Sequence, residues 1–434
     1  MKNGSRYRMR GNQNLFLLFM FALVLRLIFW VFIAHHPERA FDDDSKEYLL
    51  LAETLLDSHT FPSILRTPVY PFFIASTYAL FGKLPQAVLV FQYVCDGATA
   101  VIVALLFFRI FQNARYSFLA GFLYAINPFA IFYSHMVLSE TVFTFLFAAS
   151  VYLFITFLQS RERTHLALSS LLLGTAALCR PIALYIPLLL APFLLLAGYS
   201  FRERFMNLLI FSVMCSIVLI PWYVKNHRDF GRWTLSTVDE LNVIVSFAPE
   251  VLMIKNNPLS MFAVNVNKGI EPFQAIMRDR IQKKYASPET DPRGKENAPS
   301  PALIREEGMK VIYENPSIFV LSHVVNIGRV LVPYYPSFHR FIGSEVKMLS
   351  LLSFVIDVLI MGSFVLGVFF PLQEKVTMKS EKIAVLMMVC LIVYFSFVPG
   401  IVGYSRFRVP IVPYISIFSA LGVRKILARV RSVK

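Results

Sequence analysis

Charged side chains are scarce in this sequence. Only 16% of the 434 residues are Asp, Glu, Lys or Arg, against about 25% in a typical soluble domain. The apolar share is correspondingly high, at 56%, and includes 42 phenylalanines. This composition excludes a soluble cytosolic enzyme and a disordered regulator. Because apolar runs recur along almost the whole length, a cleaved signal followed by a soluble domain is excluded as well. The sequence predicts an all-α polytopic membrane protein.

Cysteine is also scarce, which excludes a small disulfide scaffold. The four cysteines are Cys95, Cys179, Cys215 and Cys390, and all of them lie in or at the edge of apolar runs. We expect them to pack as small hydrophobic side chains. Their spacing matches no metal-binding motif, so we assign no metal ligands to them.

Basic residues outnumber acidic ones, 42 to 27, which gives a formal net charge of +15. In a soluble protein this balance would suggest binding to nucleic acid. In a membrane protein the simpler explanation is that cytoplasmic loops collect Lys and Arg. We therefore expect the lipid bilayer as a partner and no nucleic acid.

Ten apolar segments are candidates to cross the membrane, since a spanning helix needs about 20 mostly apolar residues. The eight clear segments are 15–34, 86–108, 117–135, 139–158, 206–224, 345–371, 383–401 and 409–426. Two weaker segments, 166–179 and 182–198, are separated by Arg180-Pro181. The segments 68–82 and 317–334 are ambiguous, because each could instead lie flat at the interface. The expected architecture is a bundle of about 10–13 transmembrane helices.

The two ends of the chain are basic, and the positive-inside rule places both in the cytoplasm. The first segment is expected to remain as an anchor, since no small-residue cleavage site follows it. We divide the chain into an N-terminal catalytic membrane module at 1–233, an extracytoplasmic region at 234–344, and C-terminal transmembrane helices with a basic tail at 345–434. The stretch 286–301 is rich in Pro and charge, which indicates a surface loop. These features favour a bacterial inner membrane with the active site on the outer face.

The first outer loop, 35–85, carries three consecutive carboxylates, Asp42, Asp43 and Asp44. A short amphipathic helix is expected to begin near Ser45, because apolar residues then recur at helical spacing. Asp44 would be its N-cap, with Glu47 completing a capping box. The functional alternative is that Asp44 is a catalytic base. A divalent cation near the three aspartates is a further alternative, ranked lower because nearby arginines already supply positive charge.

Several further charged residues are expected on the same outer side. An arginine just outside the bilayer can bind a phosphate through forked hydrogen bonds, or it can simply extend its charged head to the interface. A lone glutamate in a first helical turn usually complements the helix dipole. The residues in question are Arg66, Glu140, Arg180, Arg406 and Arg408. Their convergence on one side favours a functional site over these separate structural explanations.

Three short motifs carry a resemblance to a known family. They are Asp44-Ser-Lys-Glu-Tyr48, Arg66-Thr-Pro-Val-Tyr-Pro71 and Ser139-Glu140. In this order the sequence resembles the GT-C fold glycosyltransferases that use polyprenyl-phosphate sugars, including the protein O-mannosyltransferases of glycosyltransferase family 39 and the lipid A aminoarabinose transferases. Similar pieces further along are Leu178-Cys-Arg180-Pro181, the stretch Pro221-Trp222 to Gly231, and Ser405-Arg406-Phe-Arg408-Val-Pro410.

The resemblance implies a role for each matching residue. Asp44 is the general base, Tyr48 is the aromatic residue of the motif, Arg66 contacts the lipid phosphate, and Glu140 is a second catalytic acid. The remaining residues expected to bind substrate are Asp43, Tyr70, Arg180, Arg406 and Arg408. The implied reaction transfers a sugar, with inversion, from a polyprenyl-phosphate donor to an extracytoplasmic lipid, glycan or protein.

Two other functions compete with this one. A transporter or flippase of lipid-linked sugars would predict pseudo-symmetric halves with broken helices at the midplane, and the sequence has no internal repeat. An O-antigen polymerase or ligase would place its key arginines in a large late outer loop, whereas here the motif around Asp44 comes early. Two acids lie inside apolar segments: Asp96 is expected to line a cavity, and Asp357 to act in helix packing.

Overall fold

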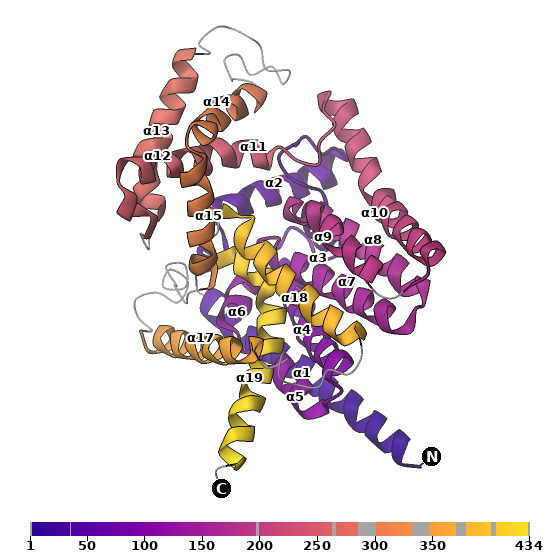
Figure 1. The fold of residues 1–434 in the computed structure, drawn as a ribbon. Coiled ribbons are helices and arrows are strands. Elements are labelled where there is room, and N and C mark those ends of the chain that lie inside the picture. The colour runs from indigo at the N-terminus through magenta and orange to yellow at the C-terminus, as the bar shows by residue number, and fades with distance from the viewer. Residues whose placement is uncertain are drawn as a thin grey trace.

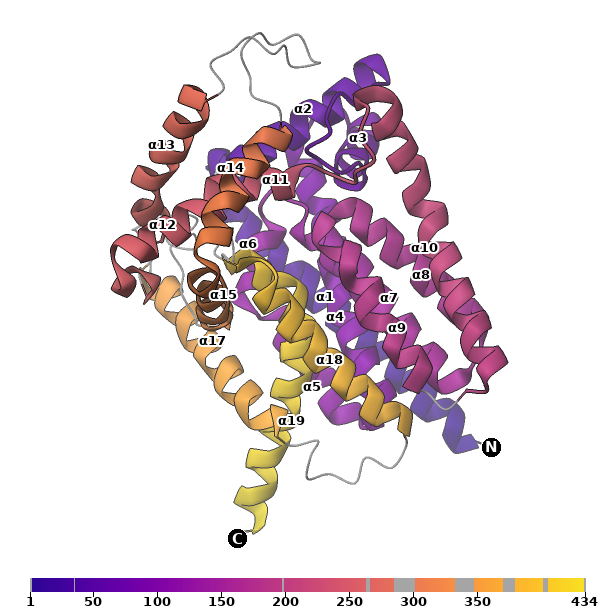
Figure 2. The ribbon, with the colours of Figure 1, turned by 45° about the horizontal axis from the view of Figure 1, so that its top comes forward.

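The computed structural model describes residues 2–34, 36–196, 199–262, 266–284, 301–331, 347–369, 379–400 and 405–432. Within these ranges every regular element is a helix, so the expected all-α architecture is confirmed. The helices pack into one bundle, and both chain ends project from the same end of it (Figure 1). The first outer loop and helices α11 to α14 lie at the opposite end (Figure 2).

The described part of the N-terminal half contains ten α-helices and two short 3-10 segments. They are α1 (Lys2–Ala34), η1 (Pro37–Ala40), α2 (Asp43–Ser58), α3 (Val69–Phe81), α4 (Pro85–Phe111), α5 (Ala114–Ala125), α6 (Pro128–Ser134), α7 (Glu140–Ser160), α8 (Arg163–Cys179), η2 (Pro181–Tyr185), α9 (Ile186–Leu196) and α10 (Phe201–Phe230).

The remaining elements begin with a group of short helices. These are α11 (Val238–Asn242), η3 (Val243–Phe247), α12 (Ala248–Asn256), η4 (Pro258–Phe262), α13 (Val266–Lys284), α14 (Pro301–Glu314) and α15 (Pro316–Leu331). The chain then returns to the bundle with α17 (Lys347–Val368), α18 (Lys379–Phe397), η7 (Ser405–Ile411) and α19 (Val412–Ser432). The predicted surface loop at 286–301 lies outside the described residues except for Pro301.

Among the described residues, seven helices are long and apolar enough to cross a membrane, and an eighth span results if the bent pair α5 and α6 is counted as one. These eight coincide with the eight clear segments of the sequence. The two weaker segments correspond to α8 and to η2 with α9, which meet at Arg180-Pro181. The ambiguous segments form α3 and α15, of 13 and 16 residues, both shorter than the length that a crossing requires.

Proline and asparagine produce the bend between α5 and α6. Asn127 caps α6 by accepting hydrogen bonds from the backbone N–H groups of Phe129 and Ala130. Pro128 occupies the first helical position, where its missing N–H costs nothing. The two helices are therefore inclined by 51°, and the chain reaches the outer corner that carries Ser139 and Glu140.

The start of α2 differs from the expected one. Its N-cap is Asp42, and Ser45 at the third helical position completes the capping box by accepting from the Asp42 backbone N–H at 2.9 Å. The predicted box of Asp44 and Glu47 is therefore wrong. Because the helix begins two residues earlier, both of those carboxylates extend from its first turns and are free to contact other segments.

Close helix contacts hold the C-terminal helices together. A Cβ atom on Gly367 of α17 would collide with the backbone carbonyl of Phe418, and one on Gly422 of α19 would collide with that of Ser363. Small residues at such a crossing let two backbones approach closely, as is common in membranes. These glycines therefore fix the position of α19, and with it that of η7 at the outer end.

Intramembrane charges are paired inside the bundle. Arg26 of α1 forms an ion pair with Asp96 of α4 at 2.5 Å, and Tyr124 donates to the same carboxylate at 2.5 Å. Asp96 therefore joins three helices, and is only 2% exposed. Buried charges of this kind are tolerated only when they are paired.

Candidate functional site

The candidate site is a network of carboxylates and arginines at the end of the bundle opposite the two chain ends, which we expect to be the outer end. At its centre is Asp44, in the first turn of α2. Its Oδ1 accepts a hydrogen bond from Arg66 Nη2 at 2.6 Å, and its Oδ2 accepts one from Arg406 Nη1 at 2.8 Å. Each carboxylate oxygen is thus held by a different arginine, one from the first outer loop and one from η7. Asp44 remains 27% exposed.

The two arginines determine the protonation state of Asp44. Burial by itself would raise the pKa of this carboxyl, but the charges and hydrogen bonds of Arg406 and Arg66 outweigh burial and lower the pKa from 3.8 to about 2. Asp44 is therefore ionised at every physiological pH. A carboxylate in this state accepts protons poorly for as long as both arginines stay on it.

A second acid, the buried Glu140, extends the network toward the interior of the bundle. Glu140 is 1% exposed and begins α7. Its Oε1 forms an ion pair with Arg180 Nη1 and lies 3.9 Å from Arg406 Nε. Arg406 therefore lies between the two acids. Arg180 also donates to Ser139 Oγ at 3.1 Å, so the corner before α7 and the break after α8 meet at this point.

Two tyrosines, Tyr48 and Tyr70, pack beside Arg66. The guanidinium of Arg66 lies 5.0 Å from the centre of the Tyr48 ring, within the range of a cation–π contact. Tyr48 packs edge-on against Tyr70 at 4.9 Å. Tyr70 in turn donates to Gln92 Oε1 at 2.5 Å. Burial raises the pKa of Tyr48, so its hydroxyl stays protonated.

Glu47 belongs to this network although the sequence assigned it only to a helix cap. It accepts a hydrogen bond from Arg66 Nε at 2.7 Å, so Arg66 bridges two acids of α2. Residues 44 and 47 lie one turn apart on a helix. This spacing puts both carboxylates on one face of α2, where a single arginine can contact both.

Two side chains from the end of α10 and the stretch after it, Lys225 and Ser236, hold the loop that carries Arg66. Ser236 Oγ donates to the carbonyl oxygen of Leu65 at 2.5 Å, and Lys225 Nζ donates to that of Phe61 at 2.8 Å. Lys225 belongs to the sequence stretch that follows Trp222 in α10. The end of α10 therefore fixes the backbone on which Arg66 depends.

Two of the predicted site residues lie apart from this network. Asp43 is 96% exposed and pairs with Lys46 at 3.4 Å. Arg408 is fully buried and forms two hydrogen bonds with Asp357 of α17, at 2.7 and 2.9 Å. The sequence suggested that Asp357 acts in helix packing. Arg408 is its buried ion-pair partner, so Arg408 takes part in the same packing contact.

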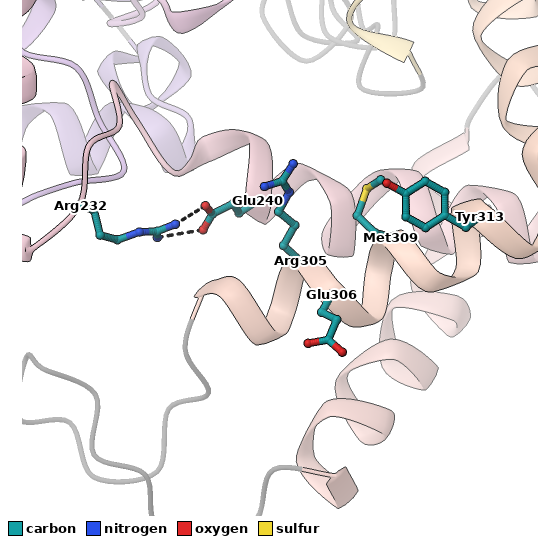
Figure 3. Close-up of a pocket in the computed structure, with 6 residues that line it drawn as sticks. All are labelled: Arg232, Glu240, Arg305, Glu306, Met309 and Tyr313. Carbon is teal, nitrogen blue, oxygen red and sulfur yellow. Dashed lines mark hydrogen bonds and ion pairs between the residues drawn. The ribbon is translucent and has the colours of Figure 1, made fainter.

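The sequence offers Asp42, Asp43 and Asp44 as the place for a divalent cation. Among the described residues no group of three or more His, Cys, Asp or Glu side chains has the geometry of a metal site. Both carboxylate oxygens of Asp44 accept hydrogen bonds from arginines, one from Arg66 and one from Arg406. The described residues also contain an outer pocket of about 280 Å³ between α11 and α14, lined by Arg232, Glu240, Arg305, Glu306, Met309 and Tyr313 (Figure 3). None of the predicted site residues lines it.

Comparison with known proteins bears on the fold and on this region. The family model of dolichyl-phosphate-mannose-protein mannosyltransferases matches residues 65–224. That range covers less than half of the chain; it includes Arg66, Glu140 and Arg180, while Asp44 and Arg406 lie outside it. No curated protein sequence matches the chain significantly.

Solved structures match over nearly the whole chain. The archaeal oligosaccharyltransferase AglB from Archaeoglobus fulgidus, in complex with an inhibitory peptide and a dolichol-phosphate, matches with a TM-score of 0.58 and 14% identity, covering 98% of this chain and 51% of that one. The apo form of the Archaeoglobus fulgidus oligosaccharyltransferase matches with 0.58 and 13% identity, covering 96% and 51%. This chain thus spans about half the length of these structures.

A weaker likeness links the chain to ArnT from Cupriavidus metallidurans bound to undecaprenyl phosphate, with a TM-score of 0.43 and 11% identity, covering 91% of this chain and 77% of that one. The oligosaccharyltransferase matches suffice for the fold. The expected GT-C architecture is confirmed: the described helices form an integral membrane bundle of the GT-C type.

Proposed function

From this GT-C fold, we propose that the chain is a membrane glycosyltransferase. It transfers a sugar from a polyprenyl-phosphate donor to a lipid, glycan or protein acceptor on the outer side of the membrane, and Asp44 is its general base. The observation that carries this proposal is the carboxylate of Asp44 held between Arg66 and Arg406. In this proposal Asp44 is the base and the two arginines that contact it bind the donor phosphate.

The arginines give the site a way to activate its base. A donor phosphate competes with Asp44 for the forked guanidinium groups, which suit phosphate geometry. When Arg66 and Arg406 turn to the phosphate, the influences that hold the pKa of Asp44 at about 2 weaken. The pKa then rises, and the carboxylate becomes a stronger base when the donor is bound.

The chemical step needs one base, Asp44, and positive charge to stabilise the leaving phosphate, which Arg66 and Arg406 supply. The oxygen of an acceptor hydroxyl attacks the anomeric carbon while its proton passes to Asp44. The bond from that carbon to the phosphate oxygen breaks, and its electron pair remains on the departing polyprenyl phosphate. The configuration inverts because attack and departure occur on opposite faces. Arg66 and Arg406 stabilise the charge that grows on the phosphate, as preorganised donors do in an oxyanion hole.

Glu140 acts in this scheme through its neighbours. It is almost inaccessible and contacts Arg180 and Arg406. A buried carboxylate of this kind orients both arginines toward the phosphate. Arg180 is a third arginine for the phosphate. Tyr48 contacts Arg66 through its ring, and Tyr70 packs against Tyr48.

A transfer assay tests the proposal. The full chain, purified in detergent, is mixed with radiolabelled polyprenyl-phosphate sugars and membrane extract. We expect transfer by the wild type and at least about a hundredfold loss in Asp44→Asn, the size typical of a lost general base. Asp57→Asn is the matched control, because Asp57 lies on the same helix and, among the described residues, forms its ion pair with exposed Lys83 at 2.9 Å.

Two results would contradict the proposal. One is donor binding without transfer by any of the proteins, which would favour the transporter or flippase. The other is an Asp44→Asn protein that transfers at the rate of Asp57→Asn, which would exclude Asp44 as the base. Thermal melting of each variant establishes that a loss of transfer does not reflect unfolding.

A further inference from the structure

Arg66 lies in a loop, so its direction depends on contacts that the loop makes with other parts of the chain. It falls between the end of α2 at Ser58 and the start of α3 at Val69, outside any regular element. The next residue, Thr67, precedes a proline, which favours an extended backbone at that position. Thr67 is only 3% exposed. Because buried polar groups are nearly always hydrogen-bonded, its hydroxyl needs a partner inside the protein.

That partner is the end of α8. Thr67 Oγ1 donates to the carbonyl oxygen of Cys179 at 3.2 Å, across 112 positions of the chain. Cys179 is the last residue of α8, and the last four carbonyls of a helix have no donor within it. Pro181 ends the helix, and the N–H of Ala183, four residues after Cys179, donates to the carbonyl of Arg180 at 3.1 Å. The threonine hydroxyl thus caps the helix immediately before Arg180.

The same helix end also contacts the corner before α7. Cys179 Sγ donates to the carbonyl oxygen of Ser139 at 3.8 Å. Ser139 Oγ accepts from Arg180 Nη1 at 3.1 Å and lies 3.4 Å from the hydroxyl oxygen of Tyr48. Cys179 and Ser139 are each 1% exposed. Thr67, Cys179 and Ser139 therefore form a buried cluster in which three segments of the chain meet.

Each member of this buried cluster is the chain neighbour of a charged site residue. The neighbours are Arg66 after Thr67, Arg180 after Cys179, and Glu140 after Ser139. The position of a residue on the backbone limits where its side chain can reach. Contacts within the buried cluster therefore set the relative positions of the charged groups, although none of its three members is charged.

Arg66 and Arg180 converge on one tyrosine. The guanidinium of Arg66 lies 5.0 Å from the centre of the Tyr48 ring, and Arg180 binds the Ser139 hydroxyl that lies beside the Tyr48 hydroxyl. The positive charges of both arginines oppose the rise that burial causes in the pKa of Tyr48. The two guanidinium groups thus act on one small group, from two backbones that the hydroxyl of Thr67 joins.

We propose that Thr67 is a positioning residue for the donor phosphate. Its hydroxyl joins the loop of Arg66 to the helix end before Arg180, and this bond holds the two arginines at the spacing at which both bind one phosphate. Guanidinium groups bind phosphate strongly only when their forked hydrogen bonds are aligned. The inference rests on the proposed function, because it assigns a donor phosphate to the two arginines.

Binding of undecaprenyl phosphate to the full chain in detergent tests this role, because it requires neither the sugar nor the acceptor. Thr67→Val replaces the hydroxyl with a methyl group of similar size. We expect its dissociation constant to rise about tenfold, since small misplacements of binding groups have effects of this order or larger. Thr67→Ser keeps the hydroxyl and should bind as the wild type does.

Thr77→Val is the matched control. Thr77 lies in α3 and is 4% exposed, and its hydroxyl donates at 3.0 Å to the carbonyl oxygen of Phe73 in the same helix. This variant therefore loses a buried threonine hydroxyl without separating two segments of the chain. We expect its dissociation constant for undecaprenyl phosphate to equal that of the wild type.

Two measurements separate positioning from stability. Partial unfolding lowers the amount of lipid bound at saturation but leaves the dissociation constant unchanged, whereas misplaced arginines raise the dissociation constant. In an Arg180→Gln background, Thr67→Val should weaken binding much less than in the wild type, because residues that act together are not additive. If valine at position 67 prevents folding, Thr67→Ala removes the same hydroxyl with a smaller side chain and should show the same rise.

The results distinguish this inference from the proposed function. A wild type that neither binds undecaprenyl phosphate nor transfers sugar would contradict the proposed function, and the inference with it. A wild type that binds the lipid, with Thr67→Val binding as Thr77→Val does, would overturn the inference alone. Equal weakening in Thr67→Val and Thr67→Ser would also overturn it, as would an undiminished effect of Thr67→Val in the Arg180→Gln background.

Discussion

Asp44 shows how one carboxylate can be a poor base at rest and a better one in the donor complex. Its two oxygens are held by Arg66 and Arg406, and the cost of burial is smaller than the effect of the two positive charges. The depressed pKa contributes stability that is present above the ordinary value of 3.8 and is lost as the pH falls through about 2. The ion pair therefore stays intact throughout the working pH range.

The pH dependence of transfer should show the proposed rise in the pKa of Asp44 when the donor binds. In the free enzyme its pKa is about 2, so kcat/KM for the donor should be free of an acid limb down to about pH 4. In the donor complex the arginines contact phosphate, so the acid limb of kcat should appear at higher pH, because a base loses activity as it becomes protonated. Initial rates measured from pH 4 to 9 check this.

Arg66→Gln provides the control for that experiment. It removes one of the two cations, so the pKa of Asp44 in the free enzyme should move upward, toward its ordinary value. The KM for the donor should rise as well, about tenfold or more, because a charged hydrogen bond to phosphate is lost. Coincident acid limbs in kcat and kcat/KM for the wild type would contradict the proposed exchange of partners.

At the scale of elements, the short segment η7 carries two arginines with opposite surroundings. Arg406 is 24% exposed and extends to the outer network, whereas Arg408 is fully buried against Asp357. The pair with Asp357 fixes η7 to α17, and the close glycine contacts fix α17 to α19. We therefore expect Arg408 to position Arg406 instead of contacting the donor.

Double substitution separates these roles of Arg408. Arg408→Leu or Asp357→Leu alone breaks this buried ion pair by removing one partner and should destabilise the fold by about 3–5 kcal/mol. Arg408→Leu/Asp357→Leu removes both charges and should recover most of that loss, together with measurable transfer. Melting temperature and transfer rate are the measurements. A stable double variant that transfers no sugar would show that Arg408 itself contacts substrate.

At the scale of the whole molecule, the network around Asp44 and the two chain ends occupy opposite ends of the bundle (Figure 2). We expect the basic termini on the cytoplasmic side, which would put the network on the outer side. An impermeant maleimide, applied to intact cells that express single added cysteines, tests this orientation. Lys46→Cys, on the exposed side of α2, should be labelled at once, and Arg431→Cys only after permeabilisation.

The native chain is the background control for that labelling. Its four cysteines lie in helices of the bundle and are buried or half-buried, so we expect little signal from them. Labelling of Arg431→Cys in intact cells, with Lys46→Cys protected, would invert the orientation and would contradict an outer active site.

The sequence by itself determined the features that depend on neighbouring residues. Apolar runs of sufficient length identified the spanning helices, and Arg180-Pro181 marked the break between α8 and η2, because hydropathy and proline act locally. The motifs around Asp44, Arg66 and Glu140 also pointed to one outer site. The start of α2 was misjudged because two candidate caps lie two residues apart, and only the backbone decides between them.

Tertiary structure alone decided which charges meet. Asp44 and Arg406 are separated by 362 positions in the chain, and no local pattern predicts that α2 and η7 become neighbours. Arg406 and Arg408 looked equivalent in sequence, yet the rotation of η7 directs one to the site and buries the other against Asp357. The physical reason is that ion-pair partners are chosen by helix packing, which depends on the shapes of all the helices at once.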